Sequence, residues 1–160
     1  MLSLRPRDAR CDNPPMVRRI AWILTFAGAI PFVAATAFLF DGDSHQRVPA
    51  IAALVTYAAV ILSFLGGIEW GLALREEAGN EKTRAIALGL SAVPSLAAWA
   101  VLWLPSPRWQ VGTALAIFVA VWAADQWLSS RGLLPSWFVD LRTAITVLVA
   151  AILGVALYLL

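Results

Sequence analysis

Residues 48–68 read VPAIAALVTYAAVILSFLGGI, a run of 21 residues that contains no charged side chain. A helix that crosses a bilayer needs about 20 mostly apolar residues, because the hydrocarbon core is roughly 30 Å thick and a helix rises about 1.5 Å per residue. The run therefore predicts a spanning helix. We expect this helix to continue through Glu69 and to end at Leu74.

Four more stretches of the chain have the same apolar character, and only Asp125 interrupts one of them; they are residues 20–40, 85–104, 111–128 and 143–160. Lipid cannot satisfy backbone N–H and C=O groups, and these stretches lack the alternation of barrel strands. The sequence thus predicts an all-α integral membrane bundle of about five transmembrane helices. We expect one helical domain over residues 20–160, preceded by a basic leader over residues 1–19.

The composition also indicates a membrane protein. Of the 160 residues, 61% are hydrophobic and 14% are charged, whereas soluble domains average roughly 45–50% and about 25%. The excess apolar surface has to face lipid, which is the first partner that we expect. The isoelectric point near 9.2 fits contacts with anionic headgroups, and no nucleic-acid partner is expected. We find no zinc spacing, phosphate loop or dinucleotide fingerprint, so no cofactor, metal site or catalytic site is predicted.

The distribution of Lys and Arg predicts the orientation in the membrane. Ten of the twelve basic residues lie before the first span, between the second and third, or between the fourth and fifth. The other side has only Arg47 and Arg108. Basic residues in short loops favour the cytoplasmic side, so we expect the N-terminus inside and the C-terminus outside. A cleaved signal peptide is an alternative, but the first apolar run is longer than the roughly 7–15 residues of a signal core.

Glu69 is the most informative residue that breaks the apolar pattern. A charged side chain is costly in the hydrocarbon, so it needs a reason. One interpretation is a proton-carrying or ligand-binding carboxylate, or a member of a buried ion pair. The other is a side chain that reaches the interface from the inner end of its helix, and we favour this one because Glu69 lies only five residues before Leu74.

Asp125 lies on the same predicted side, near the inner end of the fourth span. Arg142 begins the fifth span on that side and Arg84 begins the third. Two acids and two arginines are therefore expected in one layer. We interpret Asp125 and Arg142 as a structural ion pair, because bidentate Arg–carboxylate hydrogen bonds fix the positions of helices.

Small residues and prolines predict how the helices pack. Ser63, Gly67 and Gly71 follow one another at four-residue spacing and allow another helix to approach closely. We expect packing within the bundle first and homodimerisation second. Pro31 and Pro94 each remove a backbone hydrogen bond and predict kinks in the first and third spans.

Hydroxyls and tryptophans complete the residues of interest. Ser91 and Ser95 flank Pro94, where they are placed to bond freed carbonyls or to line a small polar cavity. Trp70 and Trp137 fall near the inner interface, as expected of an aromatic belt. Trp99 lies deeper in its span and is expected to pack in the interior.

Several segments resemble a family of uncharacterised membrane proteins, a domain of unknown function that includes mitochondrial transmembrane protein 69; they are Ile30-Pro31-Phe32, residues 63–71 (SFLGGIEWG), Val93-Pro94-Ser95-Leu96 with Trp99, Asp125, Pro135-Ser136-Trp137-Phe138, and Leu141-Arg142 with Thr146. The resemblance implies an inner-membrane protein without an assigned reaction. It also implies that the position of Glu69 varies, which weakens a proton-relay role. Asp125, Trp137 and Arg142 match the family pattern, in agreement with a structural pair.

These observations lead to three alternatives for function. The first is an accessory or assembly factor that packs against a larger membrane complex, or against another copy of itself. The second is a small transporter or channel, either a monomer or a homodimer, with a polar cavity near Glu69 and Pro94. An intramembrane enzyme is third, because the two acids lack a metal ligand or nucleophile. Acidic residues among the leader arginines are unlike a transit peptide, so we expect a multi-pass protein of a bacterial inner membrane.

Overall fold

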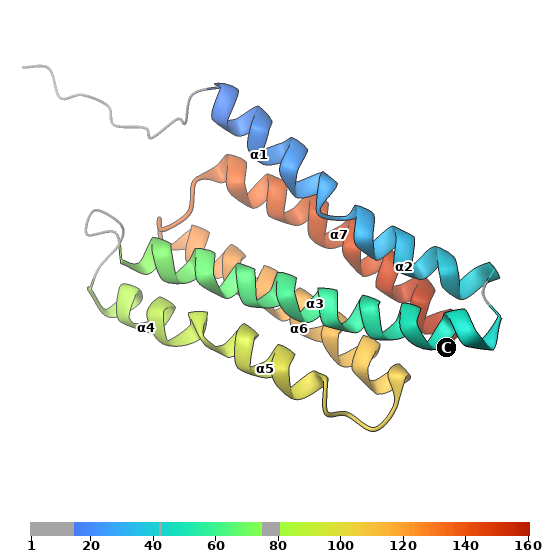
Figure 1. Ribbon diagram of the computed structural model, residues 1–160. Helices are drawn as coiled ribbons and strands as arrows, with labels where there is room; N and C mark the ends of the chain where they lie inside the picture. Colours follow the sequence, from blue (N-terminus) through green and yellow to red (C-terminus); the bar gives the residue numbers. More distant parts are fainter. Residues whose placement is uncertain (1–14, 42, 75–80) are drawn as a thin grey trace, which may run out of the picture.

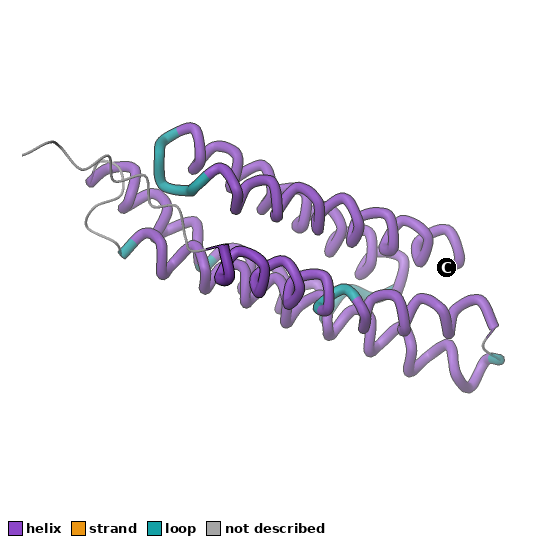
Figure 2. The backbone as a smooth tube through the Cα atoms, turned by 90° about the horizontal axis from the view of Figure 1, so that it is seen from above, coloured by secondary structure: helices purple, strands orange, loops and turns teal. Residues whose placement is uncertain are grey.

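The computed structural model describes residues 15–41, 43–74 and 81–160. These residues form seven α-helices joined by short connections: α1 (Pro15–Ala27), α2 (Ile30–Asp41), α3 (Ser44–Ala73), α4 (Glu81–Ser91), α5 (Val93–Val101), α6 (Pro107–Ser130) and α7 (Ser136–Leu159). Figure 2 shows how little of the described chain lies outside helices. Most of the basic leader, residues 1–14, and Arg75 lie outside the described residues.

Five spans are long and apolar enough to cross a membrane, and they are Pro15–Phe40, His45–Ala73, Glu81–Val101, Pro107–Ser130 and Ser136–Leu159. The all-α fold with five spanning-length helices is thus confirmed. Each predicted apolar run falls largely within one of these spans. The orientation of the bundle in the membrane stays a prediction.

Two of the five spans are broken, and both breaks come just before a proline. The first span consists of α1 and α2, and the third consists of α4 and α5. Pro31 has no N–H to donate to the carbonyl of Ala27, and its ring clashes there. The helix therefore ends at Ala27 and restarts at Ile30. Pro94 occupies the first turn of α5 in the same way. The prolines were expected to kink their helices, and the structure shows an interruption of two residues before Pro31 and of one residue, Ala92, which keeps helical dihedrals, before Pro94.

The helix α3 lies at the centre of the bundle. It packs against α2, α4, α5 and α6, while α7 packs against α6 and α2. Figure 1 shows α3 between the broken first span on one side and the broken third span on the other. The far end of the chain is tied back to α3, because Arg47 Nη2 donates to the carbonyl oxygen of Leu159 at 2.8 Å.

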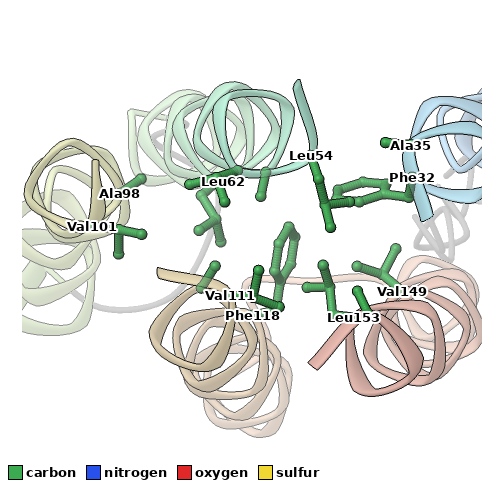
Figure 3. Close-up of a cluster of buried hydrophobic side chains, with 14 of the residues drawn as sticks. Phe32, Ala35, Leu54, Leu62, Ala98, Val101, Val111, Phe118, Val149 and Leu153 are labelled. Carbon is green, nitrogen blue, oxygen red and sulfur yellow. The ribbon is translucent and has the colours of Figure 1, made fainter. Parts of the chain in front are cut away.

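The main core is apolar and fills the middle of the bundle. Side chains from α2, α3, α6 and α7 meet there, as the close-up shows for Phe32, Leu54, Phe118 and Leu153 (Figure 3). The ring of Phe32 packs edge-on against Phe118, with centroids 5.9 Å apart. A second, smaller cluster around Ala87, Leu128 and Leu134 closes the end near the α6–α7 turn. Between the two apolar clusters lies a layer that contains buried charge.

Candidate functional site: a buried charged cluster between two broken helices

Asp125 and Arg142 form an ion pair in the interior. Arg142 Nε donates to Asp125 Oδ2 at 2.7 Å, and the two residues are 6% and 3% exposed. Both occupy positions in an otherwise apolar buried face. Asp125 lies between Val121 and Leu128 on α6, and Arg142 lies one turn before Ile145 on α7. Helical spacing therefore places both charges inside the bundle.

The turn between α6 and α7 sets the two helices against each other. Gly132 has a φ of 79°, the left-handed conformation that favours glycine. Its N–H donates to Ser129 O, and Leu133 N–H donates to Leu128 O. This pair of bonds is a Schellman motif, which ends α6 and reverses the chain. As a result α7 runs back along α6 and brings Arg142 opposite Asp125.

Glu69 joins this pair from α3. It is 3% exposed, and its carboxylate interacts electrostatically with both Asp125 and Arg142. Burial contradicts the interpretation that we favoured from the sequence, in which Glu69 reaches the interface. Position alone could not decide this point, because distance from a helix end does not tell which face of the helix a residue occupies. Three helices thus contribute one ionisable side chain each to a single layer.

The layer retains unused hydrogen-bonding capacity. Among the described residues, no partner is found for the buried atoms Glu69 Oε1, Arg142 Nη2 and Thr146 Oγ1, and outside the layer the same holds for Trp137 Nε1 and Thr36 Oγ1. Buried polar atoms in proteins are nearly always bonded. Thr146 lies one turn after Arg142 on α7, so two of these atoms belong to one stretch of one helix. The charged layer is therefore the part of the bundle best suited to hold a polar group of a ligand.

Two cavities flank the charged layer, one at each broken span. The first has a volume of about 220 Å³ and lies between the α1–α2 break, α3 and α7, with Arg142 in its wall. The second, also about 220 Å³, lies between α3, α5 and α6, with Glu69 and Pro94 in its wall. The structure thus brings Glu69 and Pro94 to one cavity, as the transporter alternative requires. Apart from Glu69, however, its lining is apolar.

The remaining predicted polar residues lie outside the charged cluster. Arg84 caps the end of α3, where Nε donates to Ala73 O at 3.1 Å and Nη2 donates to Leu74 O at 3.4 Å. Ser91 Oγ donates to Leu88 O at 2.7 Å. Ser95 lies across from α3 near Gly66. Arg84 was expected in one layer with the acids, and it stabilises a helix terminus instead. Its charge favours that place, because helix C-termini carry negative partial charge.

The expected small-residue stripe does not form a contact within the bundle. Ser63, Gly67 and Gly71 all lie on exposed positions of α3, and a Cβ added at either glycine would meet no described atom within 4 Å. The neighbouring Gly66 makes the close contact instead, because a Cβ there would overlap the carbonyl oxygen of Ser91. The contact of the stripe with another protein or another copy stays a prediction.

Three tryptophans also differ in their roles. Trp99 was expected to pack in the interior, but it is 61% exposed and contacts Trp103 edge-on at 5.9 Å. Trp70 is exposed on α3. Trp137 is partly buried, and the guanidinium of Arg18 lies 5.9 Å from its ring centroid. Trp137 therefore connects the start of α7 to α1. An apolar span gives little signal for which face a tryptophan occupies, because every face is apolar.

Sequence reasoning missed two residues that position the site. One is Gly66, which the spacing of Gly67 and Gly71 concealed. The other is Tyr57, whose hydroxyl donates to Gly28 O at 2.9 Å and so satisfies a carbonyl at the first break. A lone tyrosine in the middle of an apolar span was the available signal, since a buried phenol normally finds a hydrogen-bond partner.

Comparisons with known proteins bear on the whole bundle. A family model described as "Protein of unknown function (DUF3429)" matches residues 17–158. The chain belongs to this family. The match extends from α1 through α7, so the charged cluster and both cavities are inside it. The family predicted from the sequence is thereby confirmed.

Two curated relatives of the family are similar to this chain. Transmembrane protein 69 of Xenopus tropicalis is 36% identical over 128 residues, and that of Mus musculus is 33% identical over 126 residues. Each alignment covers 79% of this chain, but 49% and 50% of the relatives. The chain thus spans about half the length of these relatives. No solved structure gives a significant match. The chain is a multi-pass membrane protein of the DUF3429 family.

Proposed function

We propose that the protein is an accessory or assembly factor of a bacterial inner membrane, which acts by packing one helix face against a larger membrane complex. A single observation carries this proposal. The outward face of α3 carries the small residues Ala52, Thr56, Ser63, Gly67 and Gly71, all exposed, with the larger exposed side chains of Val60 and Trp70 between them. At about 100° per residue they lie within an arc of roughly 100°.

Such a row is suited to contact with another helix in lipid. Lipid tails are as apolar as leucine, so helices associate through close packing of backbones, which small residues allow. Some other exposed positions carry large side chains, such as Leu96 on α5 and Val147 and Tyr158 on α7. A partner helix could approach the α3 backbone closely at Ser63, Gly67 and Gly71. Covering this row is therefore the expected role of a partner helix.

The test is crosslinking in native membranes, followed by mild solubilisation and mass spectrometry of the proteins that co-purify. Wild type is compared with Gly67→Leu, which places a bulky side chain in the row. Gly89→Leu is the matched control, because Gly89 is also exposed, on α4, with no described atom within 4 Å of an added Cβ. We expect a stoichiometric partner that is lost only in Gly67→Leu.

Other outcomes of the same experiment separate the alternatives. A partner that is a second copy of the chain would identify a homodimer instead of an accessory subunit. If wild type purifies alone, or if Gly89→Leu loses the partner as readily as Gly67→Leu, the proposed packing face is wrong.

The bacterial localisation rests on the basic and acidic leader, and on the predicted N-in orientation. An alkaline phosphatase fused to Leu160 should be active outside the cytoplasm.

A second candidate is a small transporter or channel, which the cavity at Glu69 and Pro94 favours. This function predicts solute or ion flux in proteoliposomes that falls in Glu69→Gln. Glu81→Gln is the control, because Glu81 lies on the exposed first turn of α4. Flux equal to that of empty vesicles would exclude this candidate and leave the accessory role.

A further inference from the structure

The cavity at the first helix break combines apolar walls with one charged side chain. Apart from Thr25 and Arg142, its lining side chains are apolar, and they come from α1, α2, α3 and α7. Its volume of about 220 Å³ exceeds the roughly 150 Å³ of an engineered apolar cavity that holds benzene. A substituted six-membered ring, or several methylene groups of a lipid tail, would therefore fit.

This cavity reaches the surface of the bundle that faces lipid. Leu24 on α1 and Phe64 on α3 both line it, and they are 65% and 63% exposed. None of the 13 residues of α1 is buried, so α1 forms only an outer wall. An apolar molecule can enter from the side, between α1 and α3, without passing through water.

Arg142 lines the cavity and retains an unused hydrogen-bond donor. Its Nε is used by Asp125, whereas Nη2 is buried and has no partner among the described residues. Asp125 already neutralises the guanidinium, and Glu69 adds a second carboxylate within electrostatic range. A further anion would therefore meet a guanidinium whose charge Asp125 already balances, with a second acid nearby. An uncharged acceptor avoids this repulsion, and a carbonyl oxygen matches an N–H donor in an apolar site.

The depth of Arg142 agrees with such a ligand. The residue lies six positions after the start of α7 at Ser136, which is about 9 Å along the helix axis. That depth is just below the headgroup region of a bilayer. A lipid whose polar group sits at the interface and whose apolar part extends inward has its carbonyl at this level.

We propose that the cavity binds an uncharged amphiphile, whose carbonyl oxygen accepts a hydrogen bond from Arg142 and whose apolar part lies between α1, α3 and α7. Two sources supply this chemistry, a membrane quinone and a neutral glycerolipid ester. The site does not depend on the packing face of α3. Its failure would leave the proposed accessory role untouched, and the reverse also holds.

The test titrates the purified full chain in mild detergent with three probes of matched apolar length. They are a decyl-substituted benzoquinone, a short-chain diacylglycerol and a fatty acid, each with a ¹³C carbonyl. Isotope-edited infrared spectroscopy follows the carbonyl band, which shifts to lower frequency when the oxygen accepts a hydrogen bond. We expect saturable binding of the quinone or of the diacylglycerol, and whichever binds identifies the source. Absence of saturable binding, or tighter binding of the ionised fatty acid, would overturn the proposal.

Two variants assign the binding to this cavity. Arg142→Lys keeps the charge beside Asp125 but removes the Nη2 donor, and we expect affinity to fall about 10- to 100-fold with loss of the band shift. Ile68→Phe fills the cavity and should abolish binding, whereas Val60→Phe, at an exposed site outside the lining, should not. If Arg142→Lys fails to fold, the comparison of Ile68→Phe with Val60→Phe still tests whether the ligand binds in this cavity. Equal affinity in Ile68→Phe and wild type would show that the cavity is not the site.

Discussion

The first and third spans are broken in the same way but are closed differently. Each helix ends shortly before a proline, at Ala27 before Pro31 and at Ser91 before Pro94. At the third span the break lies tightly against α3, where a Cβ on Gly66 would overlap Ser91 O. At the first span the break leaves a cavity of about 220 Å³, and the Gly28 carbonyl is reached by a side chain instead.

The two breaks therefore differ in how the backbone beside each proline is packed against α3. A carbonyl at a break needs a partner, because lipid provides none. At the third span, Gly66 lets the α3 backbone lie so close to Ser91 that a Cβ there would overlap the Ser91 carbonyl oxygen. Tyr57 spans a larger gap and donates its hydroxyl to Gly28 O. The proline determines where a span breaks, while the facing residue of α3 determines how closely the broken span can pack.

The charged cluster lies between the two breaks and touches the cavity of each. Arg142 lines the cavity at the first span, and Glu69 lines the one at the third. The cluster joins α3, α6 and α7, and one cavity lies on each side of it. The largest expected effect on the bundle comes from breaking this cluster.

Arg142→Met should destabilise the protein by about 3–5 kcal/mol, because it leaves the buried carboxylate of Asp125 unpaired. The double variant Asp125→Leu with Arg142→Met should recover most of this loss, since apolar replacement of a buried pair is often neutral. Denaturant unfolding in detergent micelles, followed by circular dichroism, measures both. A double variant as unstable as the single one would mean that the pair is needed for more than mutual neutralisation.

Gly66→Ala should destabilise by about 1–3 kcal/mol, because the added methyl overlaps the Ser91 carbonyl and forces the third span outward. The control is Gly67→Ala, whose Cβ meets no described atom within 4 Å and which should be close to neutral. The same unfolding assay compares the adjacent glycines. Equal effects of the two substitutions would contradict the close approach at the third span.

The sequence predicts the spans well and their faces poorly. Uncharged runs are enough to find five spans, since length and apolarity are what the bilayer demands. The uncharged runs do not show which glycine faces inward. Because α3 is apolar on every face, no polar face marks its outer side. Gly67 and Gly71 gave a recognisable motif on the outer face, while Gly66 made the contact. The same ambiguity misplaced Trp99.

The charged residues show where sequence reasoning succeeds within a membrane helix. Asp125 and Arg142 were expected to meet because both break apolar runs on one predicted side, and a charge in lipid needs a partner. Glu69 was placed at the interface from its position near a helix end, and burial on α3 overrides that argument. The cavities could not be predicted, because they depend on how far each broken span stands from α3.

Tyr57→Phe should lower the free energy of unfolding by about 1 kcal/mol, the usual net contribution of a hydrogen bond. The effect on hydrogen exchange near the first break should be larger. Loss of the donor leaves Gly28 O without its partner and loosens the first break. Hydrogen–deuterium exchange should therefore speed up around residues 28–33 while residues 91–97 keep their protection. If both segments exchange faster, the two breaks are coupled through α3 instead of being closed independently.

Replacing the prolines should change the free energy of unfolding least, by no more than about 1 kcal/mol. It should nevertheless change the helix geometry of the first span and leave that of the third span unchanged. In Pro31→Ala the restored N–H can bond to Ala27 O, and the adjacent cavity leaves α1 room to straighten onto α2. In Pro94→Ala the same bond to Leu90 O is available, yet the contact between Gly66 and Ser91 O holds the break in place. Spin labels at the exposed positions 23 and 96 would report this by pulsed electron resonance. Their separation should change in Pro31→Ala and stay constant in Pro94→Ala, because only the first break has space to close; a shift in both would mean that proline alone maintains each break.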